Sequence, residues 1–213
     1  MNKILSLPIK KEIILVDDGS TDSYRRTIKS LDCYPNIHFL YHAQRMGKGA
    51  AVQTGLQAAT GDIVVIQDAD LEYDPDDIIP LVRLIELGKT DVAYGMRDLS
   101  SQRAMIRFGN RFLTWVINKL YGQSILDMTT CYKAMRVDIM NNLELKSRKF
   151  SIDAEITTKL FRMGYPIAEI PISYEPRYIN KKLKIRDGFP MLWTILKYRF
   201  WKPEMGKKFI HVE

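Results

Sequence analysis

Residues 64–77 read VVIQDADLEYDPDD, an apolar run that turns abruptly into a run of acids. The first four residues are uncharged and mostly β-branched, which is typical of a buried strand. The acids that follow are Asp68, Asp70, Glu72, Asp74, Asp76 and Asp77. The whole chain carries a formal net charge of +7, so this negative charge at one strand end needs a local explanation.

Strands of this kind alternate with helix-like stretches through the first half of the chain. The expected strands cover residues 12–18, 37–42, 62–70 and 90–97. The expected helices cover residues 21–31, 48–59 and 75–87. Such alternation predicts an α/β fold with a mainly parallel sheet flanked by helices.

Beyond Arg97 the pattern is less regular. The expected elements there are a long helix over 101–121, a strand over 131–136, a helix over 151–165 that starts at Ser151, and a strand over 167–177. The last strand contains Pro171, which cannot donate to a ladder, so we expect it at a sheet edge. No repeat, low-complexity segment or linker interrupts the sequence, so we expect one domain over residues 1–213.

The composition argues against several classes of protein. Cys33 and Cys131 are far apart and form no CxxC or Cys/His cluster, which argues against a zinc site and favours a reducing compartment. No run of 18 apolar residues occurs, so we expect no membrane-spanning helix. The first twelve residues are too short and too polar for a signal peptide.

Asp68 and Asp70 are the strongest candidates for a metal site. Residues two apart in a strand point to the same side, so both carboxylates can reach one point at the carboxyl edge of the sheet, where open α/β sheets bind ligands. Mg²⁺ or Mn²⁺ would relieve their repulsion and bring phosphate oxygens. An EF-hand is excluded, because Tyr73 replaces its glycine and Ile79 its final glutamate. We expect Asp74, Asp76 and Asp77 to form a solvated turn and helix cap.

Two further segments point to the same edge. LVDDGSTD (15–22) also places acids, Asp17 and Asp18, directly after a strand. In QRMGKGAAVQTG (44–55), Gly47 and Gly49 flank Lys48 at a helix start, which suits a diphosphate. The segment is neither a Walker A loop nor a GxGxxG fingerprint, and alone it is compatible with an ordinary glycine-rich helix start.

Together these segments resemble the family-two glycosyltransferases of the GT-A (Rossmann-like) fold, especially those that make polyprenyl-phosphate sugars. The matching segments are VDDGSTD (16–22), GKGAA (47–51), GDIVVIQDADLE (61–72), VAYGMR (92–97), RFGNR (107–111), DMTTCYKAMR (127–136), FSIDAEI (150–156), AEIPISYEPR (168–177) and NKKLKIRDG (180–188). The resemblance covers nearly the whole chain. It implies inverting transfer of a sugar from GDP-mannose or a UDP-sugar to polyprenyl or dolichyl phosphate.

The resemblance also implies roles for individual residues. Asp68, Asp70 and Glu72 would bind Mg²⁺ or Mn²⁺ within a motif that includes Ala69. The nucleoside would face Asp17 and Asp18, and the donor would lie near Lys48. Residues expected to face phosphates of donor or acceptor are Arg97, Arg107, Lys181 and Lys182. The acceptor-side acids would be Asp127, Asp153 and Glu155.

Asp70, Arg97 and Asp153 are the catalytic candidates. A general base is dispensable for a lipid phosphate, which is already ionised, and is required for a sugar hydroxyl. Asp153 is therefore either that base or a cap of the helix over 151–163.

The resemblance departs at the N-terminus. The family opens with a strand and a Pro-xx-Asn-Glu loop around the nucleotide base, whereas Met1 falls where the following helix would end. We therefore expect an N-terminally shortened sheet that lacks a strand between residues 12–17 and 62–68, with donor binding affected most. A fragment, a shortened start and a truncated form that closes the gap are all compatible with this sequence.

The expected organisation is a nucleotide-sugar half (1–97), an acceptor half (98–188) and a basic, aromatic tail (189–213). Residues 189–203, FPMLWTILKYRFWKP, suit a helix lying on an anionic membrane. We therefore expect a cytoplasmic protein bound peripherally at the inner face of the membrane. The apolar stripe of residues 101–121 is either core or a second interfacial helix.

Three other functions make different demands on the sequence. A GT-A enzyme acting on a sugar hydroxyl in cell-wall or exopolysaccharide synthesis would need a base. An inactive scaffold would bind no nucleotide. Nucleic-acid binding is disfavoured by the acidic edge, although the basic tail would permit it.

Overall fold

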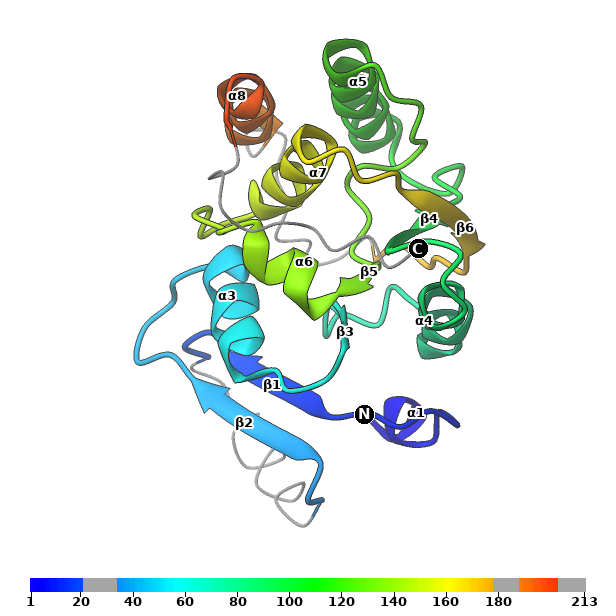
Figure 1. Ribbon diagram of the computed structural model, residues 1–213, viewed down its shortest axis with the longest axis vertical. Coiled ribbons are helices and arrows are strands. Elements are labelled where there is room, and N and C mark those ends of the chain that lie inside the picture. Colours follow the sequence, from blue (N-terminus) through cyan, green and yellow to red (C-terminus); the bar gives the residue numbers. More distant parts are fainter. Residues whose placement is uncertain (21–33, 178–187, 203–213) are drawn as a thin grey trace.

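The computed structural model describes residues 1–20, 34–177 and 188–202, and in these residues the strands form two sheets (Figure 1). The smaller sheet pairs β1 (Ile13–Asp17) with β2 (Ile37–Tyr41) in parallel. The larger sheet has the order β3-β5-β4-β6. Its strands are β3 (Ile63–Val65), β5 (Lys133–Arg136), β4 (Val92–Arg97) and β6 (Ala168–Ile172). The α/β class with mixed sheets is confirmed, as is the edge position of β6.

Among the described residues parallel pairing predominates as expected, with five residue pairs in each of the two parallel ladders and three in each of the two antiparallel ladders, but the strand order was not predicted. β5 runs antiparallel to both β3 and β4, and only β4 and β6 are parallel within the larger sheet. Strand patterns in a sequence report burial, and they do not report direction, so the insertion of β5 between β3 and β4 could not be inferred. β1 and β3 lie in separate sheets, at the place where the sequence predicted an interrupted sheet.

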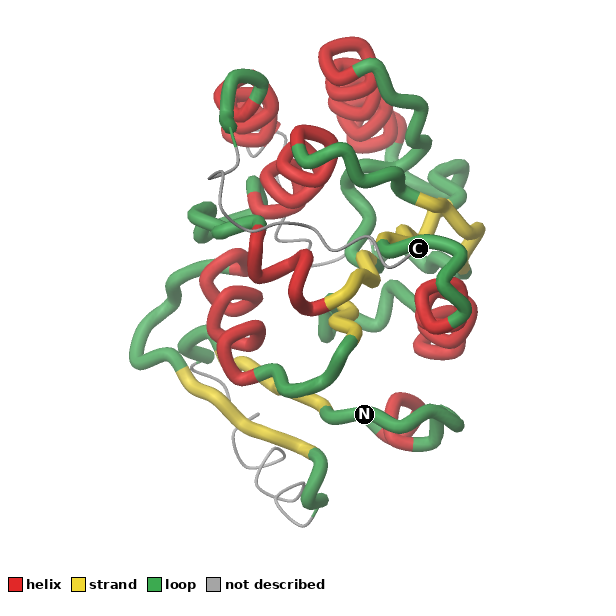
Figure 2. The backbone as a smooth tube through the Cα atoms, viewed as in Figure 1, coloured by secondary structure: helices red, strands yellow, loops and turns green. Residues whose placement is uncertain are grey.

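The helices follow the predicted boundaries closely where the sequence offers start and stop signals (Figure 2). Asp74 caps the short helix η1 (Pro75–Asp77) by accepting from the Asp76 N–H at 3.0 Å, and α4 (Ile78–Glu86) follows. α5 (Ala104–Tyr121) ends at Gly122, whose left-handed φ of 66° suits glycine. The other helices are α1 (Asn2–Leu5), α3 (Lys48–Ala58), α6 (Val137–Asn142), α7 (Ile152–Arg162) and α8 (Gly188–Tyr198). α1 lies where the resemblance implied the end of a helix, and α6 was missed, because six residues are too few to show a helical period. The helix expected over 21–31 lies outside the described residues.

Two hydrophobic cores lie on opposite sides of α7. The larger core joins the four-stranded sheet with α4 and α6, and includes Leu81, Tyr132 and Ile156. The second core lies between α5, α7 and α8, and includes Ile117 and Ile195. α7 is therefore a middle layer, which Figure 1 shows between the sheet and the outer helices. Its polar residues are buried as well, so each needs a partner inside the protein.

Candidate active site

Asp68 and Asp70 lie in the turn that follows β3. The Asp68 N–H donates to the Cys131 thiol sulfur at 3.1 Å, which fixes the start of the turn on the larger sheet. Leu71 has a left-handed φ of 63° and is 85% exposed, so the chain accepts backbone strain here without gaining burial. Asp70 Oδ1 accepts from the Glu72 N–H at 3.2 Å, and Ala69 lies exposed between the two acids. Strain without packing benefit is common at functional turns.

Lys48 joins this turn to α7. Its Nζ atom lies 3.1 Å from Asp68 Oδ2 and 3.3 Å from Asp153 Oδ2, while Lys133 Nζ lies 3.2 Å from Asp153 Oδ1. Burial disfavours the charged form of Lys48, but Asp153 and Asp68 hold its pKa well above the usual value. Two acids and two lysines thus alternate in a largely buried chain of ion pairs, which we call the charge ladder.

Asp70 is outside the charge ladder, and its ion-pair partner among the described residues is the half-exposed Arg177. Burial is the main cause that raises its pKa, and repulsion from Asp68 and Glu72 raises it further. Arg177 relieves this only in part, since its Nη2 atom lies 3.6 Å from Asp70 Oδ2. A carboxylate in these surroundings is stabilised by added positive charge.

The turn therefore fits a divalent cation if a substrate phosphate supplies some of its ligands. Within residues 1–20, 34–177 and 188–202, no three His, Cys, Asp or Glu side chains are placed to hold a metal by themselves. Lys48 forms an ion pair with Asp68, which the sequence did not predict. Mg²⁺ characteristically binds through one or two carboxylates together with substrate phosphates, so Asp68 and Asp70 suit a metal that arrives with a diphosphate.

Glu72 was predicted as a metal ligand, and the structure engages its carboxylate elsewhere. Oε2 accepts from the Tyr174 hydroxyl and Oε1 from the Arg177 N–H, both at 3.0 Å. Its side chain is buried, and its carbonyl accepts from the Glu175 N–H. Glu72 thus ties the acidic turn to the segment after β6, and its role toward a metal stays a prediction.

Asp17 and Asp18 do lie where β1 ends, and both shape the neighbouring loops. Asp17 Oδ1 accepts from the Ser20 N–H at 3.0 Å. The Asp18 carboxylate accepts from the Met46 and Gly47 amides, each at 2.8 Å, and pairs with His42 at 2.8 Å. Burial alone would raise the pKa of Asp18, but these hydrogen bonds hold it below its usual value. Asp18 therefore holds the loop that presents Lys48, and its expected contact with a nucleoside stays a prediction.

Arg97 and Asp127 were predicted to face substrate, and here they face each other. Arg97 Nε and Nη2 donate to the two Asp127 oxygens at 2.6 and 2.8 Å, and Nη2 also donates to the Thr129 hydroxyl. Burial alone would raise the pKa of Asp127, but the Arg97 guanidinium holds it below the usual value. Asp127 thus fixes the position of the Arg97 guanidinium, and the expected role of Arg97 toward phosphate stays a prediction.

The remaining phosphate-facing candidates are Arg107, Lys181 and Lys182. Arg107 lies on α5 and donates to the Ser100 carbonyl at 2.8 Å. Lys181 and Lys182 lie outside the described residues. Their roles toward phosphate stay predictions.

Glu155 anchors a loop that sequence reasoning assigned to the acceptor side. Its carboxylate accepts from the Lys146 and Ser147 amides, pairs with Lys159 at 2.7 Å, and accepts from the Tyr198 hydroxyl. The anchored loop then contacts the start of α3, since the Arg148 carbonyl accepts from the Ala50 N–H at 3.0 Å. This contact helps to set the position of Lys48.

Lys133 and Cys131 belong to the site and were not singled out by the sequence. Lys133 is fully buried, donates to the Thr130 carbonyl and lies over the Tyr94 ring. Burial lowers its pKa in spite of Asp153. A lysine at a central position of a buried strand (CYKAMR) is the only sequence signal that could have identified it.

Gly49 allows the loop and α3 to approach closely. A Cβ at this position would lie 2.1 Å from the Ser147 carbonyl oxygen, a backbone atom that cannot swing away. We expect Gly49→Ala to lower the free energy of unfolding by about 2 kcal/mol or more and to weaken nucleotide binding, because Lys48 must shift. Urea unfolding checks the first effect and nucleotide titration the second.

Gly109 gives the matched control for this substitution. It lies within α5, and a Cβ there meets nothing within 4 Å. Gly109→Ala should be neutral or stabilise by about 0.5–1 kcal/mol, as expected for glycine replaced in a helix. An equal stability for both variants would show that the loop and α3 are not tightly packed.

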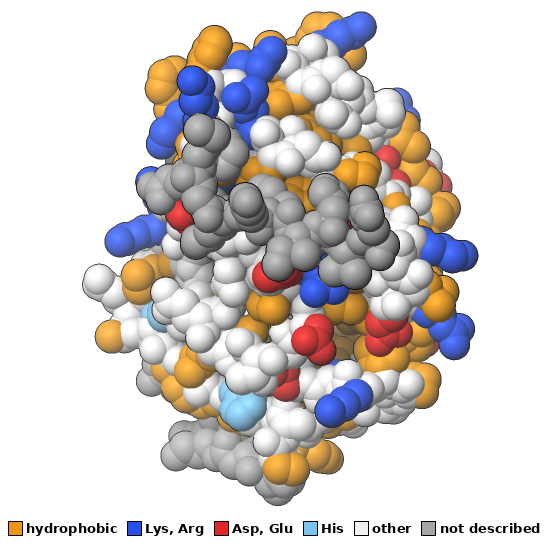
Figure 3. Space-filling view, viewed as in Figure 1, with side chains coloured by type: hydrophobic (Ala, Val, Ile, Leu, Met, Phe, Trp, Pro, Cys, Tyr) orange, Lys and Arg blue, Asp and Glu red, His pale blue; other side chains and the backbone are white. Residues whose placement is uncertain are grey.

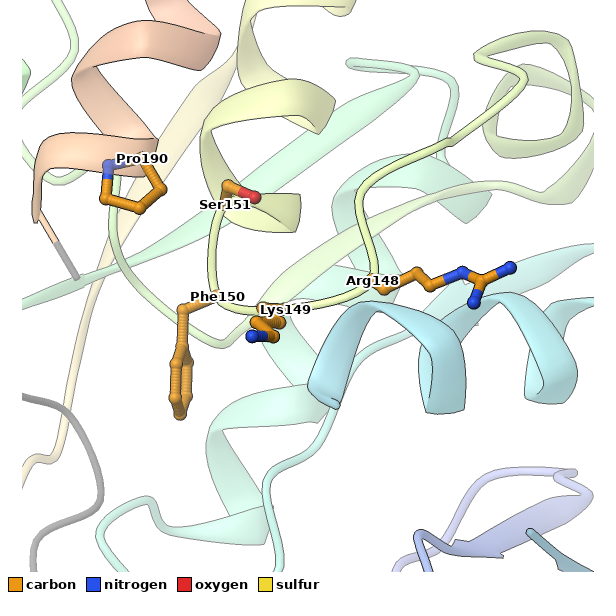
Figure 4. Close-up of a pocket in the computed structure, with 5 residues that line it drawn as sticks. All are labelled: Arg148, Lys149, Phe150, Ser151 and Pro190. Carbon is orange, nitrogen blue, oxygen red and sulfur yellow. The ribbon is translucent and has the colours of Figure 1, made fainter. Parts of the chain in front are cut away.

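An open hollow of about 290 Å³ lies beside the start of α7 (Figure 4). It is lined by Arg148, Lys149, Phe150, Ser151 and Pro190. Ser151 begins α7 as predicted, but its side chain makes no capping hydrogen bond. The hollow thus connects the loop held by Glu155 with the first turn of α8.

Comparison with known proteins places these features in a family. A model described as glycosyl transferase family 2 matches residues 2–143. Glycosyltransferase AglD of Haloferax volcanii is 26% identical over 193 residues, which are 87% of this chain and 31% of AglD. Dolichol-phosphate mannosyltransferase of Pyrococcus furiosus is 27% identical over 207 residues, which are 92% of this chain and 57% of that protein. The chain thus spans only part of the length of these two relatives.

The fold is also shared with a solved structure. Glucosyl-3-phosphoglycerate synthase from Mycobacterium tuberculosis, in complex with Mn²⁺, uridine-diphosphate-glucose and phosphoglyceric acid, matches with a TM-score of 0.69 at 21% identity. The match covers 91% of this chain and 70% of that one. Since the family model covers more than half of the sequence, the chain belongs to glycosyl transferase family 2.

Proposed function

We propose that the chain is a metal-dependent, inverting glycosyltransferase that moves a sugar from a nucleotide-sugar donor to a polyprenyl phosphate. The observation that carries this proposal is the turn after β3, which places Asp70 beside the Asp68–Lys48 pair with the half-exposed Arg177, at 3.6 Å, as its ion-pair partner among the described residues. β1 ends in Asp17 and β3 leads into Asp68, so acids follow both strands. A divalent cation bound to a nucleoside diphosphate would place positive charge beside Asp70 and negative charge beside Lys48.

The side chains of the turn would divide the work on the donor. Asp68 and Asp70 would hold Mg²⁺ or Mn²⁺, which stabilises the negative charge that grows on the leaving diphosphate. Lys48 would place its ammonium beside the same phosphates, held in position by Asp68 and Asp153. Asp18 and Glu155 would fix the two loops that orient Lys48.

The ion pairs of Asp153 favour a phosphate acceptor over a sugar hydroxyl. Its two oxygens face Lys48 and Lys133, so it is poorly placed to accept a proton from a sugar hydroxyl. A phosphate acceptor is ionised near neutral pH and needs no base. The name of one relative, dolichol-phosphate mannosyltransferase, supports transfer to a lipid phosphate.

Peripheral contact with a membrane forms part of this proposal. None of the described helices combines the length and the apolarity that crossing a bilayer requires. The basic and aromatic residues 189–202 would bring the chain to the cytoplasmic face, where the acceptor headgroup lies.

The direct test uses radiolabelled UDP- and GDP-sugars with dolichyl or undecaprenyl phosphate. We expect one donor to give a labelled lipid in the presence of Mn²⁺, and EDTA to abolish the product. Transfer to a simple sugar but to neither lipid would contradict the acceptor class. Full activity in EDTA would contradict the metal.

A further inference from the structure

α5 and α8 expose rows of large apolar side chains. On α5 these are Met105, Phe108, Phe112 and Trp115, with exposed fractions of 63, 71, 42 and 57%. On α8 and just after it they are Phe189, Trp193, Leu196 and Phe200, with exposed fractions of 73, 67, 43 and 85%. Both rows follow spacings of three and four residues, so each occupies one face of its helix. We call the eight side chains the aromatic face.

The fold does not need the aromatic face for its own packing. The second core uses the opposite sides of the two helices, including Leu113 and Ile117 of α5 and Met191 and Ile195 of α8. The sequence left open whether the apolar residues of 101–121 belong to the core or to an interfacial helix. In the structure one side of α5 packs in the second core and the other side is exposed. Surface rows of this size usually mark an interaction site.

The two rows belong to one surface. α5 and α8 are in direct contact, and the Tyr121 hydroxyl donates to the Ile195 carbonyl at 2.8 Å. Within α5, Phe108 stacks on Phe112 and Phe112 on Trp115, with ring centroids 6.4 and 6.2 Å apart. Figures 1 and 3 show both helices at one end of the molecule, where apolar and basic side chains gather.

The charged residues of the two helices themselves are all basic. Neither α5 nor α8 contains an acidic residue. The exposed cations on or beside the two helices are Arg103, Arg111, Lys119, Lys197 and Lys202. Two copies of this surface would bring cations against cations, whereas anionic lipid headgroups would neutralise them.

We propose that α5 and α8 together lie on an anionic bilayer, with the aromatic face inserted among the headgroups. Phenylalanine and tryptophan favour this depth, and flanking lysine and arginine favour the headgroup phosphates. This deepens the proposed function by giving the membrane contact two helices instead of the tail alone. It requires no transfer reaction, so the two proposals can fail separately.

The surface would also orient the catalytic side toward the membrane. Pro190, in the first turn of α8, lines the hollow beside Arg148 and Lys149. The Tyr198 hydroxyl of α8 donates to Glu155, which holds the loop in contact with the start of α3. A lipid phosphate at this surface would therefore reach the hollow without leaving the headgroup layer.

The test measures vesicle binding by flotation, with vesicles of phosphatidylcholine alone and of phosphatidylcholine with phosphatidylglycerol at about 3:1. We expect the full chain to float only with the anionic vesicles, and salt to weaken the binding. Phe108→Ser with Trp115→Ser, and separately Phe189→Ser with Trp193→Ser, should each weaken binding about tenfold or more. Leu87→Ser is the control, because Leu87 is an equally exposed apolar residue at the end of α4 and should have no effect.

Tryptophan fluorescence tests each helix without removing its aromatic character. In the double variant Trp193→Phe, Trp201→Phe the α5 reporter Trp115 is the one tryptophan left, and in Trp115→Phe, Trp201→Phe it is the α8 reporter Trp193. Brominated lipid should quench both reporters. Quenching of Trp193 but not Trp115, or a loss of binding only in the α8 variant, would overturn the two-helix surface. Equal binding to neutral vesicles, or a dimer that the Phe108→Ser, Trp115→Ser variant dissociates, would overturn the choice of an anionic bilayer.

Discussion

Replacement of Asp70 by asparagine is expected to lower sugar transfer by about a thousandfold. Asparagine keeps the shape and the hydrogen bond that Asp70 Oδ1 accepts from the Glu72 N–H, and it removes only the negative charge. The fold should survive, because burial and the neighbouring Asp68 and Glu72 disfavour the charged form of Asp70 and raise its pKa. Transfer measured with a labelled donor over a range of Mn²⁺ concentrations checks this expectation.

Asp76 gives the matched control for Asp70. It lies in the same acidic run, is well exposed and pairs with Lys3 at 3.3 Å. Asp76→Asn should keep normal transfer and an unchanged Mn²⁺ requirement. If Asp70→Asn retained more than about a tenth of the activity, Asp70 would not be a metal ligand.

Replacement of Asp153 by asparagine is expected to destabilise the protein by about 3–5 kcal/mol, because it leaves a buried cation without its counter-ion. Lys133 is fully buried and Asp153 is its ion-pair partner in the described residues. Lys48 loses one of its two carboxylates at the same time. Urea unfolding measures the change.

The same substitution predicts a specific dependence on pH. Burial already holds the pKa of Lys133 below its ordinary value, and loss of Asp153 would lower it further. A lysine whose pKa is lower in the folded state binds fewer protons there than in the unfolded chain, so stability rises with pH between the two values. The free energy of unfolding that Asp153→Asn loses relative to the unsubstituted protein should therefore become smaller as the pH rises from about 7 to about 9.5.

Asp138 is the control for Asp153. It pairs with Arg136 at 3.5 Å on the surface, where both side chains are at least half exposed. Asp138→Asn should cost less than about 1 kcal/mol at either pH. A similarly small, pH-independent loss for Asp153→Asn would show that the charge ladder is not the stabilising network described.

Much of the α/β pattern was predictable because its signals are local. The buried residues before Asp68, the acids after them and the cap at Asp74 can all be read within a few neighbours. The start of α3 between Gly47 and Gly49 is equally local. Strand direction is not local, and the antiparallel insertion of β5 was missed for that reason.

The partners of the charged residues were the least predictable part of the site. Arg97 meets Asp127 from 30 residues away, and Glu72 meets Tyr174 from 102 residues away. Sequence patterns supply the residue types, and only the fold decides which charges neutralise each other. Asp68 shows the limit most clearly: its position after β3 was foreseen, and its pairing with Lys48 was not.

The measurement that bears most directly on the metal-bridged diphosphate is the melting temperature of the protein with UDP and with GDP, each with and without Mn²⁺. Ligands that bind only the folded state raise the melting temperature. We predict that one nucleotide raises it with Mn²⁺ present, that omission of the metal removes the rise, and that Asp70→Asn shows none. A rise of equal size without Mn²⁺, or in Asp70→Asn, would contradict the account.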